Sequence, residues 1–170
     1  MTDPVDPAAR LLDRLRDEGR TLATAESLTG GLVGASLTAV AGSSDVYLGG
    51  VVSYAISIKT AVLSVPEALI EDHGVVSEAC AIAMADGARA LTGADLAVAT
   101  TGVAGPGPQD GLPPGTVWVA VSSGTGHAAT ELALSGDRDD VRRGAAAAAL
   151  ELALDFSPWR SRRREVTAVR

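Results

Sequence analysis

The stretch TLATAESLTGG, residues 21–31, marks the point where a predicted strand gives way to a predicted helix. Residues 21–26 are predicted to form the strand, and Gly30 and Gly31 mark the turn into a helix over residues 32–40. Between them lie a carboxylate, a serine and a threonine hydroxyl. Such a stretch fits a reaction centre, a phosphate-binding turn or a plain helix start. Motifs elsewhere in the sequence are needed to distinguish these three interpretations.

On both sides of this stretch the chain alternates helical and strand patterns. Helices are predicted over residues 6–19, 66–74, 77–93 and 139–154 and around Lys59, and strands over residues 46–55, 95–101, 116–123 and 127–134. The last two strands form a hairpin, which is antiparallel, whereas the helices between the earlier strands favour parallel pairs. This order predicts an α/β fold, a three-layer α/β/α sandwich with a mixed, mostly parallel sheet of about five strands.

Composition limits what kind of protein this is. With 170 residues, 46% of them hydrophobic, the chain suits one domain, expected over residues 1–156, with a basic, flexible tail over residues 157–170. No apolar run reaches the roughly 18 residues that span a bilayer, and the acidic start is unlike a signal peptide. We therefore expect a cytoplasmic protein with no membrane partner. The formal charge of -7 disfavours a nucleic-acid partner.

Familiar chemical motifs are missing from the sequence. Cys80 is the only cysteine, and His73 and His127 are the only histidines, so no disulfide and no recognisable metal-ligand spacing is present. The chain also lacks a G-x-G-x-x-G fingerprint, a phosphate-binding P-loop and a G-x-S-x-G elbow. We expect neither a metal nor a cofactor.

Lys59 is the only lysine, beside thirteen arginines. Arginine stays protonated in proteins, whereas a desolvated lysine can act as the base that a serine nucleophile needs. Tyr54 lies five residues before Lys59, across a predicted strand-to-helix junction that can bring both side chains to one site. In Ser–Lys hydrolases a neutral lysine or a tyrosinate accepts the serine proton. The alternatives are a lysine retained by chance and an ordinary strand tyrosine.

Three glycine-rich segments each follow a predicted strand: residues 25–31, 100–111 and 135–140. Ligands of open α/β sheets bind beyond the carboxyl ends of strands, where helix N-termini offer unpaired N–H groups. The first and third segments also precede helices, so we expect their N–H groups to face an anion.

Six motifs, in order, resemble one known family: TAESLTGG (24–31), GGVVSYAISIK (49–59), GVVSEA (74–79), ATTGVAGP (99–106), GTVWVAV (115–121) and SGDRDDVRR (135–143). Over roughly residues 10–155 they are similar to the C-terminal domain of the competence- and damage-inducible protein CinA. The resemblance implies nicotinamide mononucleotide deamidase activity, which hydrolyses the nicotinamide amide to nicotinic acid mononucleotide and ammonia in pyridine nucleotide recycling. It also implies a homodimer of the stand-alone form.

The resemblance assigns roles by motif. Ser27 becomes the nucleophile, and Tyr54 and Lys59 become the proton-transfer pair. The remaining expected binding residues are the backbone around Thr29, Gly30 and Gly31 for an oxyanion, the loop residues Gly102, Ala104 and Gly105, and the phosphate partners Arg138 and Arg142 with Asp137 orienting one of them. Apart from the resemblance, Ser43 and Ser44 form a second serine pair in a loop, and we expect them to face the substrate or to cap a helix rather than to act as nucleophiles.

One departure from the family pattern leaves alternatives open. Ile56 stands where many members have an asparagine beside the catalytic pair. A second hypothesis is therefore a nucleotide-binding or regulatory domain without turnover. A third is an accessory of DNA uptake or repair, suggested by the family name and the basic tail and disfavoured by the negative charge. The alanine-rich last helix could pack against a partner or against its own sheet.

Overall fold

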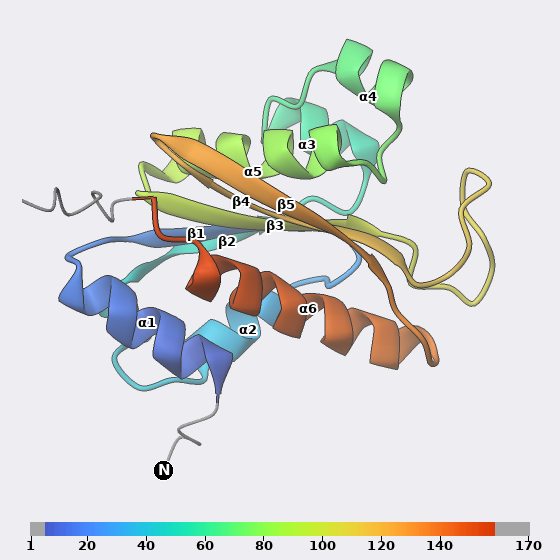
Figure 1. Ribbon diagram of the computed structural model, residues 1–170. Helices are drawn as coiled ribbons and strands as arrows, with labels where there is room; N and C mark the ends of the chain where they lie inside the picture. Colours follow the sequence, from blue (N-terminus) through green and yellow to red (C-terminus); the bar gives the residue numbers. More distant parts are fainter. Residues whose placement is uncertain (1–5, 159–170) are drawn as a thin grey trace, which may run out of the picture.

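The computed structural model describes residues 6–158 and shows three layers (Figure 1). Its elements are α1 (Pro7–Asp17), β1 (Leu22–Glu26), α2 (Leu32–Thr38), a 3-10 turn η1 (Ser43–Asp45), β2 (Tyr47–Val52), α3 (Ile56–Ala61), α4 (Glu67–His73), α5 (Glu78–Thr92), β3 (Leu96–Gly102), β4 (Thr116–Ser123), β5 (Gly126–Ala133) and α6 (Arg138–Asp155). Helices α1, α2 and α6 cover one face of the sheet, and α3, α4 and α5 lie on the other (Figure 1). The predicted order of elements and the α/β/α sandwich are confirmed.

The five strands lie in the order β2-β1-β3-β4-β5. Strand β1 pairs in parallel with β2 and with β3, while β4 runs antiparallel to both β3 and β5. Four of the five strands therefore point the same way, which confirms the mixed, mostly parallel sheet. In this register Glu26 pairs with Val52 and with Thr100, so three strands end side by side at one edge.

The core has a different composition on each face of the sheet. Under α1, α2 and α6 it is built from leucine and valine, including Leu11, Leu12 and Leu15, each 0% exposed. Under α5 it is mostly alanine, with Met84 among the few large side chains. Truncating a buried leucine such as Leu11 to alanine should cost about 2–5 kcal/mol, since the site cannot fully collapse around the lost atoms.

The alanines of α6 pack inside the molecule. Ala145, Ala149 and Ala153 are 0% exposed and belong to the core beneath the sheet. Of the two uses the sequence left open for this helix, the alanine face serves its own domain. Small side chains suit this role because they let the helix backbone approach the sheet closely.

The ends of the helices are fixed by the expected residues. Asp6 accepts from the N–H of Ala8 ahead of Pro7, and Ser77 accepts from the N–H of Cys80. Helix α6 begins one residue earlier than predicted, because Asp137 caps it and forms a reciprocal pair of hydrogen bonds with Asp140.

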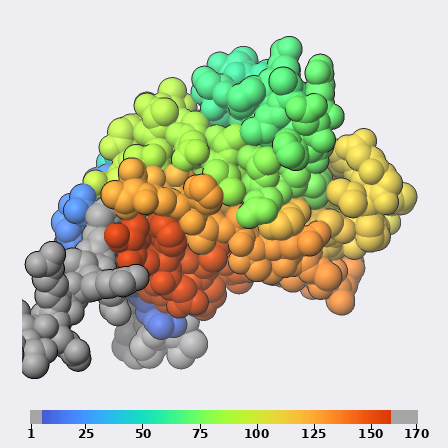
Figure 2. Space-filling view, turned by 45° about the horizontal axis from the view of Figure 1, so that its top comes forward, coloured from blue at the N-terminus to red at the C-terminus, as the bar shows by residue number. Residues whose placement is uncertain are grey.

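At one end of the molecule the segment of α3 and α4 and the loop after β3 project on the same side (Figure 2). Residues Ile70, His73, Asp110 and Leu112 line a cleft between them. Within residues 6–158, no helix combines the length and the apolar character that crossing a bilayer requires. The predicted basic, flexible tail covers residues 157–170, and residues 159–170 of it lie outside the described part of the chain.

Candidate active site

Ser27 is the first residue beyond the carboxyl end of β1, which lies between β2 and β3. Its N–H donates to the carbonyl oxygen of Thr100 at 3.0 Å, and its own carbonyl accepts from Gly30 at 3.0 Å. The turn that follows places Gly30 at φ 59° and Gly31 at φ 103°, a region that side chains with a Cβ rarely adopt. Strand and turn together hold the Ser27 hydroxyl in a pocket of about 300 Å³.

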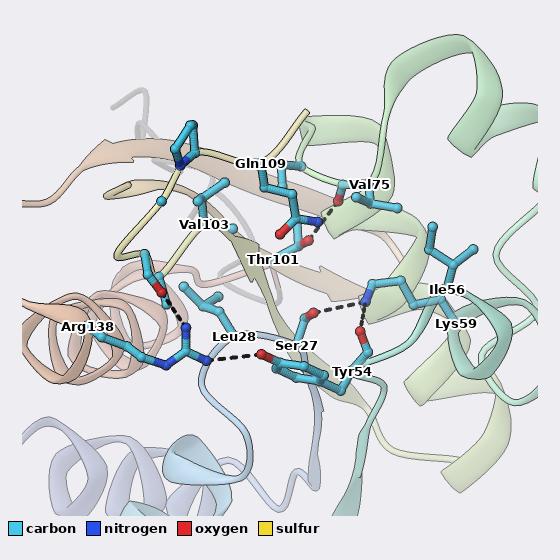
Figure 3. A pocket seen from close by; sticks show the side chains of 16 residues that line it. Ser27, Leu28, Tyr54, Ile56, Lys59, Val75, Thr101, Val103, Gln109 and Arg138 are labelled. Carbon is cyan, nitrogen blue, oxygen red and sulfur yellow. Dashed lines mark hydrogen bonds between the residues drawn. The ribbon is translucent and has the colours of Figure 1, made fainter. Parts of the chain in front are cut away.

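Lys59 reaches the same pocket from α3. Its side chain is 2% exposed, and Nζ lies 2.9 Å from Ser27 Oγ (Figure 3). Nζ also donates to the carbonyl oxygens of Ser53 at 2.5 Å and Tyr54 at 3.4 Å. The structure thus brings together the hydroxyl and the amine that the sequence placed 32 residues apart.

The amine of Lys59 has no acidic partner. Within residues 6–158, no carboxylate lies within ion-pair distance of it. Burial lowers the pKa of Lys59 below its ordinary value, and the nearby Cys80 acts weakly in the opposite direction. Its three contacts are with one hydroxyl and two carbonyl oxygens, all of them neutral groups that do not compensate a charge on the amine.

Tyr54 contributes its backbone to this contact but not its phenol. The phenol oxygen accepts from Arg138 Nη2 at 3.0 Å, and the residue is 61% exposed. The ring therefore lies at the rim of the pocket, bonded to neither Ser27 nor Lys59 (Figure 3). Its predicted part in proton transfer stays a prediction.

Arg138 borders the opposite side of the pocket, at the first residue of α6. Besides the bond to Tyr54, its Nη1 donates to the carbonyl oxygen of Gly105 at 2.6 Å. Gly102, Ala104 and Gly105 line the pocket together with Gln109, so the glycine-rich loop forms one wall (Figure 3). Gly102 also lies so close to β4 that a Cβ there would meet the backbone of Val117 at 2.8 Å.

Glu26 is a residue of this site to which the sequence gave no role. It is 2% exposed, and its carboxylate accepts from Thr29 Oγ1 at 2.7 Å and from the N–H groups of Gly31, Val33 and Gly34 at 2.8–3.0 Å. The carboxylate therefore caps α2 from inside and ties its first turn to β1. The available signal was an acidic residue ending a strand before a glycine turn.

This cap corrects the expectation for the turn. Gly31 donates its N–H to Glu26, and Gly30 donates its N–H to the Ser27 carbonyl, so neither is free for an oxyanion. Thr29 is 0% exposed, and its hydroxyl contacts both Glu26 and Thr100. The expectation of an oxyanion contact was wrong for Gly30 and Gly31, because the anion at this helix N-terminus is the carboxylate of Glu26, while the contact expected of the Thr29 backbone stays a prediction.

Three other expected residues lie elsewhere. Arg142 points at the back of the Ser27 turn, where it donates to the carbonyl oxygens of Leu28 at 3.0 Å and Thr29 at 3.1 Å. Asp137 caps α6 rather than orienting an arginine. Ser44 lies in η1, which precedes β2, so it sits at the opposite end of the parallel strands from Ser27. The prediction that Ser44 faces the substrate was wrong.

The fold and the site together define an α/β/α domain that carries a buried serine–lysine pair at the end of an interior parallel strand. The sequence matches the CinA C-terminal domain over residues 5–156. The chain belongs to this family.

Two sets of known proteins support the assignment. A CinA-like protein of Salinibacter ruber is 48% identical over 151 residues, which cover 88% of this chain and 37% of that protein, and one of a Mycobacterium species is 51% identical over 136 residues, which cover 79% and 32%. The chain spans about a third of the length of these curated relatives.

Solved structures match over almost their whole length. The competence damage-inducible protein A of Klebsiella pneumoniae superposes with a TM-score of 0.85 at 38% identity, covering 90% of this chain and 96% of that one. The competence/damage inducible protein CihA of Agrobacterium tumefaciens gives a TM-score of 0.84 at 35% identity, covering 92% and 99%.

Proposed function

We propose that this domain hydrolyses the amide of nicotinamide mononucleotide, giving nicotinic acid mononucleotide and ammonia, with Ser27 as nucleophile and Lys59 as base. The observation that carries the proposal is the 2.9 Å contact between Ser27 Oγ and a buried amine that no carboxylate among the described residues pairs with. Membership of the CinA family supports the substrate class. The activity fits the cytoplasm, where the pyridine nucleotides it would recycle are found.

The chemistry proceeds in two halves. Neutral Lys59 accepts the Ser27 proton as Oγ attacks the amide carbon, and the resulting ammonium gives up a proton while the amide nitrogen gains one. The C–N bond then breaks and ammonia leaves, with the acyl group held as an ester on Ser27. Water, deprotonated by Lys59, attacks this ester, and Ser27 Oγ leaves with the proton. The carboxylic acid that is released then loses its proton to the free ammonia or to water, which gives the carboxylate product.

The tetrahedral intermediates need a donor for the oxyanion. The N–H of Leu28 directly follows the nucleophile, and Leu28 lines the pocket. In many serine hydrolases the N–H after the nucleophile fills this role. Loss of one such donor typically costs about 10²–10³ in rate.

The test is ammonia release from nicotinamide mononucleotide by the purified protein. Ser27→Ala should lower kcat at least about 10³-fold, since the nucleophile is lost. Lys59→Arg places a permanently protonated group beside Ser27 that cannot accept a proton, so it should lose activity to a similar extent. Full activity in Lys59→Arg would rule out the lysine as base, and no turnover by the unmodified protein would sink the proposal.

A second candidate function is nucleotide binding without turnover, in a regulatory role. Two observations favour it: Ile56 lines the pocket at 52% exposure, and the Tyr54 phenol points to Arg138 rather than to Ser27. Calorimetry that shows binding of nicotinamide mononucleotide, with no ammonia released over hours, would decide for this candidate.

A homodimer remains a proposal, which sedimentation of the full chain would test.

A further inference from the structure

Arg138 joins three separate segments at the mouth of the pocket. From the start of α6 its guanidinium donates to Gly105 in the loop after β3, and to the phenol of Tyr54 between β2 and α3 (Figure 3). Both acceptors are neutral. The side chain therefore bridges the pocket mouth through two hydrogen bonds that carry no compensating charge.

The acidic residues beside Arg138 are engaged elsewhere. Asp137 caps α6, and Asp139 and Asp140 pair with Arg143. Among the described residues, no carboxylate lies within 4.0 Å of the Arg138 guanidinium. Of the lysine, arginine, histidine and carboxylate side chains within residues 6–158, only Lys59 and Arg138 line the pocket. A permanent cation held only by neutral groups can gain a bidentate, charge-assisted contact from a dianion.

We propose that the phosphate group of the substrate takes Arg138 away from Tyr54, and that the released phenol then turns toward Ser27 and Lys59. This inference rests on the proposed function. A phosphate dianion brings negative charge and can accept two parallel hydrogen bonds from the guanidinium, whereas the phenol offers one neutral acceptor, so the phosphate wins the competition for Arg138. Tyr54 is 61% exposed, which leaves its ring free to turn.

The released phenol has a defined task. It gives its proton to the leaving amide nitrogen and receives the proton that Lys59 took from Ser27, so its own charge is unchanged over the step. Binding of the phosphate is thereby coupled to proton transfer. With an amide substrate that lacks a phosphate, the Tyr54 phenol stays hydrogen-bonded to Arg138 and does not reach Ser27. Part of the phosphate's binding energy would then appear in kcat rather than in KM.

The coupling can be tested by supplying the amide part and the phosphate part of the substrate as two separate molecules. Nicotinamide riboside carries the amide without the phosphate, and phosphite dianion supplies the missing charge. Saturating phosphite should raise riboside hydrolysis about ten-fold or more in the unmodified protein. It should have no effect in Arg138→Ala. Arg143→Ala is the matched control, since Arg143 lies on the same helix outside the pocket, and it should respond like the unmodified protein. No activation, or equal activation in Arg138→Ala, would overturn the inference.

A second measurement does not depend on turnover. The chain has two tyrosines, so fluorine NMR of protein labelled with 3-fluorotyrosine gives two signals, which Tyr54→Phe assigns. Phosphite should shift the Tyr54 signal in the unmodified protein and leave it in place in Arg138→Ala, with Tyr47 as internal reference.

Removing the competitor should also tighten anion binding. Tyr54→Phe leaves Arg138 without its phenol partner, so it should bind phosphite about two- to ten-fold more tightly than the unmodified protein does. An unmoved Tyr54 signal together with unchanged phosphite affinity would refute the competition, even if the protein hydrolyses nicotinamide mononucleotide. If hydrolysis is absent and both responses occur, the proposed function fails and the competition for Arg138 stands.

Discussion

Two turns that border the same pocket look alike in sequence and are built in opposite ways. The turn after β1 is buried over residues 27–29, and the Glu26 carboxylate accepts hydrogen bonds from the N–H groups of the helix start that follows it. The turn before α6 is exposed and capped by Asp137, with Arg138 left facing the pocket. A glycine-rich turn before a helix is therefore no anion site when a carboxylate of the chain already caps the helix. Here the capacity to bind an anion lies in a side chain at the second turn.

The largest expected effect is a loss of activity without a matching loss of stability, on replacement of the lysine that contacts the first turn. Lys59→Met should lower kcat/KM at least about 10³-fold, equivalent to about 4 kcal/mol of barrier, because the base is gone. Its free energy of unfolding should change by less than about 1.5 kcal/mol, since methionine fills a similar volume and removes a buried polar group. Ammonia release and urea unfolding measure the two quantities.

The pH dependence of the same variant provides its control. The pKa of Lys59 is lower in the folded chain than in the unfolded one, so between the two values the unfolded chain binds more protons. The free energy of unfolding of the unmodified protein should therefore rise with pH across that window, relative to Lys59→Met. Activity should rise as pH passes the folded value, below the ordinary pKa of lysine. Parallel stability curves for the two proteins would contradict a shifted amine.

The next effect breaks the cap of the first turn. Glu26→Gln puts an amide group against N–H donors and removes the charge, so it should cost about 2–4 kcal/mol of unfolding free energy. Activity should fall with it, because Ser27 loses its fixed turn. Glu151→Gln, on an exposed position of α6, is the control. A Glu26 variant as stable as that control would show that the buried carboxylate is not what holds α2 to β1.

A smaller effect is expected behind the same turn. Arg142→Ala removes the donors to Leu28 and Thr29 and should cost about 1 kcal/mol. Because these bonds hold the turn and not the ligand, kcat should fall several-fold while KM stays close to its original value. Steady-state kinetics beside Arg143→Ala would test this, and a rise in KM alone would place Arg142 among the ligand contacts instead.

The smallest stability effect belongs to the second turn. Arg138→Ala should change the free energy of unfolding by no more than about 0.5 kcal/mol, since the residue is exposed and its bonds are few. Its kcat/KM for nicotinamide mononucleotide should nevertheless fall about ten-fold or more. Thermal unfolding and steady-state kinetics of the same sample would show the contrast. A large loss of stability would make Arg138 a structural clamp.

The helices and strands could be predicted because capping and turn residues close in the sequence determine where they begin and end. Asp6 with Pro7, Ser77 with Gly93, and the glycine turns fix where each element begins or stops, and these signals act within a few residues. The pairing of Ser27 with Lys59 could be anticipated for another reason. A chain that uses arginine everywhere else keeps one lysine, beside the end of a strand.

The remaining site residues depend on distances that a sequence does not contain. Arg138 and Arg142 lie one helical turn apart on α6, yet one reaches the pocket and the other reaches the back of the Ser27 turn. The cap formed by Glu26 exists only because the chain folds back over the strand end. Ser44 was misplaced because parallel strands send the residues before and after them to opposite ends of the sheet.

Strand β1 lies between two neighbours, and all five of its residues are buried. We expect its amide protons to exchange with solvent mainly through opening of the whole domain, as is typical of buried strands that are paired on both sides. Ser27 is attached to the end of this buried strand. The reactive hydroxyl therefore cannot drift out of place while the domain stays folded, and heat should abolish catalysis and structure in a single event.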